Sequence, residues 1–190
     1  MSTIQYNSKG LFHGTCQFKI YSMLYDNGVP ISATLDDGTV VKPDKNTIIT
    51  NYKILFRNDA GQTHREDGPA LIYPNGYKAW WINGQRHRED GPAIIYADGH
   101  KAWWINGQRH KIDGPAFIGT NGSKAWWING KKHREDGPAI IGTNGDKAWR
   151  INDQYYGKGE EPPEEYLQAL VSKGVIKHPN AFKRGSDDYE

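Results

Sequence analysis

Four histidines, each followed three residues later by an aspartate, are the side chains of this chain best suited to chemistry. They open the segments HREDGPA at 64–70, 87–93 and 133–139, and HKIDGPA at 110–116. A histidine oriented by a carboxylate is a common general base, and both residue types bind metal ions. Catalysis, metal binding, surface recognition and a structural turn are therefore the hypotheses to compare.

The spacing of the histidines favours the structural turn. Successive segments start 23 residues apart, and a fixed short period is typical of stacked structural units. With two strands per unit, equivalent histidines lie about 10 Å apart, whereas the ligands of one zinc ion lie about 2 Å from it. An enzyme also needs one assembled site rather than four equal ones. We therefore expect a turn capped by the aspartate through its own backbone, no enzymatic activity, no catalytic residue, no metal and no cofactor.

The residues between the histidines predict β-hairpins. The runs Leu71-Ile72-Tyr73 and Ala79-Trp80-Trp81-Ile82 are rich in β-branched and aromatic residues. Asn75-Gly76 lies between them and Asn83-Gly84 follows, and this dipeptide favours two-residue hairpin loops because both residues accept a positive φ. The sequence therefore predicts a mainly β fold, a single-chain antiparallel meander of stacked hairpin repeats with an N-terminal β-rich cap and a short C-terminal helix.

Changes in the repeat pattern divide the chain into four segments. Residues 1–60 form an N-terminal cap or hold eroded repeats, with Asn27-Gly28 and Asp37-Gly38 as candidate turns. Residues 61–156 form the repeat array, which ends after Asp153 replaces the expected glycine. Residues 157–182 form a cap with a helix over 162–174, since two prolines and two glutamates favour a helix start. Residues 183–190 are charged and expected to be disordered.

The period, the paired turns and the motif WWINGxxHREDGPA resemble those of MORN repeats, in the variant form often seen in phage, large-virus and bacterial antitoxin-like proteins. The resemblance covers roughly residues 61–156. It departs from the usual repeat at Asp67-Gly68-Pro69, where MORN repeats have Gly-x-Gly. It implies a non-enzymatic binding or scaffolding module, because members act as binding modules, some resemble immunity proteins, and some are proposed to bind acidic lipids.

Composition limits the class of partner and the compartment. The chain has 190 residues and a net charge of +2, and residues 64–152 carry 13 basic and 9 acidic side chains. This charge is much weaker than that of dedicated nucleic-acid binders, so nucleic acid is disfavoured. One cysteine, Cys16, excludes an internal disulfide and fits a reducing compartment. With no signal peptide pattern and no run of about 20 apolar residues, we expect a cytoplasmic protein, in the host cytoplasm or the virion if phage-encoded.

A two-residue loop at Asn75-Gly76 would pair Leu71 with Trp80 and Ile72 with Ala79. Side chains alternate along a strand, so these pairs predict two faces. The predicted core face carries Leu71, Tyr73, Lys78, Trp80 and Ile82, with Trp103 as a later equivalent. The predicted open face carries Ala70, Ile72, Ala79 and Trp81, and its later rows end in Trp104, Trp127 and Arg150.

The predicted binding residues are two rows that repeat along the array. They are Trp81, Trp104, Trp127 and Arg150 on the open face, and Lys78, Lys101, Lys124 and Lys147 beside them. The alternative is that the tryptophans are packed, while the lysines and the turn arginines provide solubility and pair with the turn glutamates. Aromatic residues are enriched at protein interfaces. We therefore expect another protein as partner, with the chain acting as an inhibitor, immunity or antitoxin-like protein, or phage assembly or accessory factor. Self-association is a second possibility, and an acidic lipid or glycan bound by both rows is the alternative.

Overall fold

The structure of the protein is a computed structural model that describes residues 5–6, 12–17, 21–50 and 53–183. The chain forms two compact units, residues 1–87 with 94–98, and residues 88–93 with 99–190. The tail predicted to be disordered lies outside the described residues except for Lys183. In the described part, no helix is long and apolar enough to cross a membrane.

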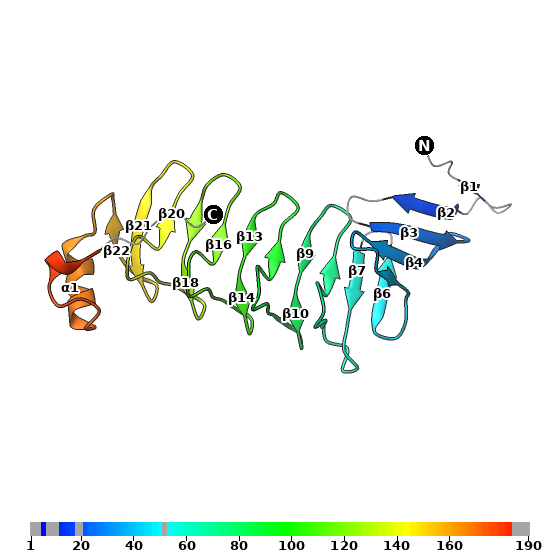
Figure 1. Ribbon diagram of the computed structural model, residues 1–190, viewed down its shortest axis with the longest axis horizontal. Helices are drawn as coiled ribbons and strands as arrows, with labels where there is room; N and C mark the ends of the chain where they lie inside the picture. Colours follow the sequence, from blue (N-terminus) through cyan, green and yellow to red (C-terminus); the bar gives the residue numbers. More distant parts are fainter. Residues whose placement is uncertain (1–4, 7–11, 18–20, 51–52, 184–190) are drawn as a thin grey trace. The chain divides into compact units, whose positions relative to one another are not determined.

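The predicted fold class is confirmed, because most of the described secondary structure is an antiparallel meander. The first sheet has five strands in chain order: β1 (Gln5–Tyr6), β2 (Phe12–Gln17), β3 (Tyr21–Asp26), β4 (Val29–Leu35) and β5 (Val40–Val41). A second sheet has eleven strands and holds one hairpin from each repeat (Figure 1). Its strands are β6 (Thr47–Thr50), β7 (Lys53–Phe56), β8 (Leu71–Ile72), β9 (Lys78–Ala79), β12 (Ile94–Ile95), β13 (Lys101–Ala102), β16 (Phe117–Ile118), β17 (Lys124–Ala125), β20 (Ile140–Ile141), β21 (Lys147–Ile151) and β22 (Gln154–Lys158).

Three short hairpins lie outside the large sheet, one after each of the strands β9, β13 and β17. They are formed by β10 (Trp81–Ile82) with β11 (Gln85–Arg86), β14 (Trp104–Ile105) with β15 (Gln108–Arg109), and β18 (Trp127–Ile128) with β19 (Lys131–Lys132). The two-residue loop predicted at Asn83-Gly84 is confirmed here, since both residues have positive φ, 47° and 78°. The first three repeats therefore each contribute one hairpin to the large sheet and a second, separate hairpin, whereas the second hairpin of the fourth repeat, β21 with β22, stays in the large sheet.

The two-residue loop predicted at Asn75-Gly76 is wrong. Leu71 pairs with Ala79, one residue away from its predicted partner Trp80. The turn spans 73–77, and within it Gly76 alone has a positive φ, 97°. The Asn75 side chain accepts a hydrogen bond from the backbone N–H two residues later, at 3.0 Å, which stabilises this longer turn. The hairpins of the third and fourth repeats have the same register.

The shift by one residue overturns the predicted faces, because it moves every side chain of a strand to the other face. Ile72 lies opposite Lys78 on one face, and Leu71 lies opposite Ala79 on the other. The strand also ends at Ala79, and the following Trp81 belongs to a different sheet. The predicted sets are thus wrong as sets: neither Leu71, Tyr73, Lys78, Trp80 and Ile82 nor Ala70, Ile72, Ala79 and Trp81 share one sheet face.

Each unit has its own apolar core. In the first unit, β3 to β5 pack on β6 to β8 through buried residues that include Met23, Ile54 and Ile72. In the second unit, the predicted helix is present as α1 (Glu164–Ser172), followed by the 3-10 helix η1 (Pro179–Ala181). Tyr166 and Leu170 of α1 are fully buried against Trp149 of β21, so this helix covers the last repeat (Figure 1).

Candidate functional site

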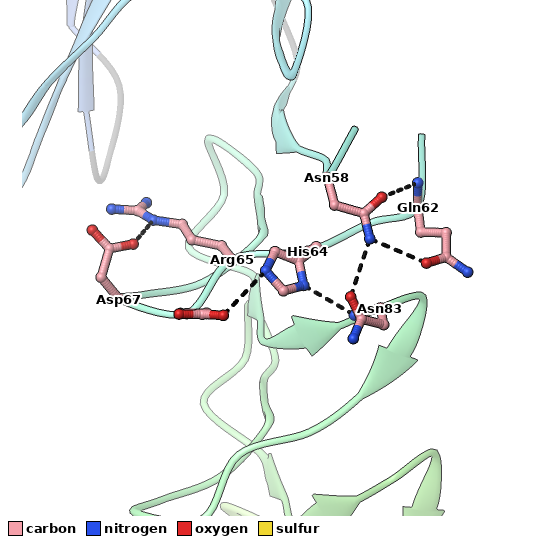
Figure 2. A network of polar contacts seen from close by, with 7 residues as sticks. Asn58, Gln62, His64, Arg65, Asp67 and Asn83 are labelled. Atoms are coloured by element: carbon pink, nitrogen blue, oxygen red, sulfur yellow. Dashed lines mark hydrogen bonds and ion pairs between the residues drawn. The ribbon is translucent and has the colours of Figure 1, made fainter. Parts of the chain in front are cut away.

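The repeated histidines connect one repeat to the next. His64 Nδ1 accepts a hydrogen bond from the backbone N–H of Asn83 at 3.1 Å, and Asn58 donates to the Asn83 side chain at 3.1 Å (Figure 2). His64 Nε2 lies 3.7 Å from the Glu66 carboxylate. Nδ1 thus contacts the next repeat, while Nε2 faces a carboxylate of its own turn.

The same contact recurs in the second unit. His110 accepts from the Asn129 N–H at 3.1 Å, and His133 accepts from the Asn152 N–H at 3.3 Å. Each of these asparagines lies 19 residues further along the chain. Asn129 is at the tip of the short hairpin β18–β19, and Asn152 is in the turn between β21 and β22. Among the described residues, no three His, Cys, Asp or Glu side chains are grouped so that they could hold a metal ion.

In the three HRED turns, the arginine and the aspartate form a compact ion pair, in addition to the predicted contact with its own backbone that Asp67 and Asp90 each make. Arg65 Nε donates to Asp67 at 2.7 Å, and this hydrogen bond lowers the pKa of the Asp67 carboxyl below its usual value. These ion pairs join each arginine to the aspartate of its own turn. The equivalent pairs are Arg88 with Asp90 at 2.8 Å and Arg134 with Asp136 at 2.9 Å.

Glycine follows the aspartate because the guanidinium lies directly over its Cα. A Cβ atom at Gly137 would lie 2.6 Å from Arg134 Cζ, closer than real Cβ contacts. The corresponding distances at Gly68 and Gly91, to their own arginines, are 3.1 and 3.0 Å. Arg134 is almost fully buried and its Cζ lies 4.0 Å from the centroid of Trp126. The arginine, aspartate and glycine are therefore one structural unit.

The predicted tryptophan row is half-buried and stacked against cations. Arg109 Cζ lies 5.3 Å from the ring centroids of both Trp104 and Trp127. Trp81 has Arg86 at 5.1 Å, and Trp127 has Lys132 on its ring at 5.1 Å. Each such contact stabilises by about 0.5–2 kcal/mol. The row is thus a cation–aromatic ladder along the short hairpins.

Arg150 replaces tryptophan in the last row, and its partner changes with it. Tyr155 lies opposite Arg150 in the strand pair, where the earlier rows have a cation. The Arg150 guanidinium carbon lies 5.0 Å from the Tyr155 ring centroid. The aromatic and the cation have therefore exchanged strands, and the contact is kept.

The predicted lysines lie in the large sheet, whereas the tryptophans lie in the short hairpins, so one sheet does not hold both rows. Lys78 binds Asp36 and Lys147 binds Glu160, at 2.8 and 2.9 Å. On the same face, the lysines alternate with isoleucines through the strand pairs Lys101–Ile118, Lys124–Ile118, Lys124–Ile141 and Lys147–Ile141.

The third turn, in the segment HKIDGPA, breaks the arginine–aspartate pattern. Lys111 replaces arginine, and its ammonium lies 4.3 Å from the Trp103 ring centroid. Burial lowers the pKa of this lysine, although Asp113 opposes the shift. Ile112 replaces glutamate and is 76% exposed. In the described part of the chain, Asp113 makes no hydrogen bond or ion pair.

Two grooves flank this turn. The larger, of about 670 Å³, is lined by Trp103, Ile105 and Lys111 and by the acidic residues Glu89, Asp90 and Asp113, among others. The smaller, of about 280 Å³, is lined by Trp126 and Ile128 among others. Ile112 lines both grooves. The sequence prediction of binding residues did not include this turn, although the change from HRED to HKID is visible in the repeat alignment.

No family model matches the chain, and no curated protein matches it significantly.

Proposed function

We propose that the chain is a non-enzymatic β-repeat module that binds another protein, and that the third turn is the centre of its binding surface. The observation that carries the proposal is the exception at Ile112. An aliphatic side chain stands 76% exposed at a position where the other repeats have glutamate. Protein interfaces place apolar and aromatic groups at their centre and charged groups at the rim.

The residues that recur in the repeats support this proposal, because they already interact with other residues of the stack. The described histidine and tryptophan rows join repeats through hydrogen bonds and ring contacts, and the arginines stabilise their own turns through ion pairs. Side chains used in this way are not available as a general base or nucleophile. The same reasoning fits the MORN-like repeat proposed from the sequence, in which the stack is a scaffold and its variable positions select the partner.

A photo-crosslinking amino acid at position 112 tests this function in cells of the source organism. We expect a discrete protein adduct from position 112. A matched probe at Val175, which is also exposed but follows α1, should not give that adduct. The proposal fails if both positions yield the same set of adducts, or if position 112 yields none.

A second candidate function is binding to an anionic lipid surface. The row that alternates Lys101, Ile118, Lys124, Ile141 and Lys147 favours it, because basic and apolar groups together bind acidic membranes. Sedimentation with vesicles containing phosphatidylserine, at low and high salt, tests this candidate. Substitution of Lys101 and Lys124 by glutamine should abolish sedimentation if the candidate is right and leave it unchanged otherwise.

A further inference from the structure

In the third turn, Asp113 has no arginine two residues before it, because Lys111 stands at that position. In the three turns with the HRED sequence, an arginine Nε donates to the aspartate two residues later at 2.7–2.9 Å. In the third turn, Lys111 places its ammonium on the Trp103 ring instead. Asp113 is exposed and, within the residues described, has no hydrogen-bond or ion-pair partner.

The surroundings of Asp113 favour a cation with an apolar neighbour. The larger groove is lined by Asp113 together with Glu89 and Asp90 of the preceding turn, and Lys111, which interacts with Asp113 through its charge, lines it beside Trp103. Arg88 in the same groove is held by Asp90. Ile112 stands at the edge of this groove with most of its side chain in solvent.

The other turns of this chain provide a template for the bound group. In each, a planar guanidinium donates to an aspartate oxygen and lies over a glycine that leaves room for it. The third turn keeps the aspartate and the glycine, as Asp113 and Gly114, although Gly114 has a positive φ of 127° that the other three glycines do not share. Arginine matches a carboxylate better than lysine does, because its planar donors form charge-assisted hydrogen bonds in a fixed geometry.

We propose that this groove binds an arginine side chain of a partner protein, with the guanidinium on Asp113 and an adjacent aliphatic side chain on Ile112. This inference rests on the proposed function only in naming a protein as the source of the arginine. The partner thus supplies in trans the group that the other turns supply in cis.

The probe is the dipeptide N-acetyl-leucyl-arginine amide, titrated into the full chain and followed by amide chemical shifts in NMR. The matched probe has citrulline in place of arginine, which keeps the shape and removes the charge. We expect the arginine dipeptide to shift the amides of 112–114, and the citrulline dipeptide to bind about ten-fold more weakly, as loss of one charged hydrogen bond implies. Equal affinities for the two dipeptides, or no shifts in 112–114, would overturn the proposal.

Two variants test the role of the turn. Asp113→Asn should weaken the arginine dipeptide about ten-fold, while the control Asp67→Asn, in a turn with its own arginine, should leave the affinity unchanged. The double substitution Lys111→Arg with Ile112→Glu restores HRED and should close the site, abolish binding and keep the fold. If Asp113→Asn binds as the unmodified chain does, or the HRED variant still binds, the proposal is wrong.

The outcome is separable from that of the proposed function. If the dipeptide does not bind but position 112 crosslinks to a protein, the proposed arginine specificity is wrong and the proposed binding function is supported. If the dipeptide binds and no protein is crosslinked, the groove is real and the proposed function falls.

Discussion

Substitution of Gly137 by alanine should destabilise the fold more than any other single glycine-to-alanine change in the HRED turns. The added Cβ would lie 2.6 Å from Arg134 Cζ and 2.9 Å from its Nε. Gly137 does not have a positive φ, so the cost comes from this contact and not from the backbone.

The guanidinium of Arg134 has little room to move. It is 3% exposed, donates to Asp136 at 2.9 Å and to the Pro138 carbonyl at 3.3 Å, and lies against Trp126. Displacing a charged donor from its acceptors costs about 1.5–3 kcal/mol per hydrogen bond. Because Asp136 is half exposed, water replaces part of that loss. We expect a loss of about 3 kcal/mol in the free energy of unfolding.

Urea unfolding followed by circular dichroism measures this loss. Gly68→Ala is the matched control, because its Cβ would lie 3.1 Å from Arg65 Cζ and that arginine is less buried, so about 1 kcal/mol is expected. In an Arg134→Ala background, Gly137→Ala should be nearly neutral. The reasoning is refuted if Gly137→Ala and Gly68→Ala cost the same, or if the cost persists after Arg134 is removed.

Three further predictions concern other contacts. A double-mutant cycle with Arg150→Trp and Tyr155→Lys, which restores the order of the earlier rows, should give a favourable coupling of about 0.5–1 kcal/mol in urea unfolding; additive effects would contradict the exchanged contact. His110→Ala should cost about 1–2 kcal/mol, because the Asn129 N–H loses its acceptor; calorimetry showing no change would contradict the connecting role. Burial raises the pKa of Tyr166 in the folded state. The stabilising contribution of Tyr166 is therefore present below the unfolded pKa of about 10 and is lost as the pH rises above it. Tyr166→Phe should reduce this loss of stability at alkaline pH, and an unchanged pH profile of unfolding would contradict the prediction.

The repeat period carried most of the predictable information about the fold. Repeated turn dipeptides and alternating apolar runs indicate hairpins locally, and the helix over 164–172 follows from prolines, glutamates and one apolar stripe. The register of the first hairpin was not predictable in this way. Asn75-Gly76 and Asn83-Gly84 are the same dipeptide, yet they adopt different turns. The longer turn differs by one residue, and that difference exchanges the faces.

The site was less predictable, because its contacts join residues far apart in the sequence. The cation on each tryptophan comes from the opposite strand or from the preceding repeat, as with Arg109 and Trp127. The exchange of Arg150 with Tyr155 becomes visible only when the strand partner is known. By contrast, the replacements at Lys111 and Ile112 are visible in the sequence. That Asp113 therefore lacks an arginine partner becomes clear only from the arginine–aspartate pairs of the other turns.

The central claim is that residues common to the repeats hold the stack, while the exceptional turn selects the partner. Co-purification from cells of the unmodified chain and of the Lys111→Arg, Ile112→Glu variant, with melting temperatures of both, tests this most directly. We expect the variant to melt at the same or a higher temperature and to lose the protein that crosslinks at position 112. If the variant retains that partner at full yield, recognition does not reside in the third turn and the account is contradicted.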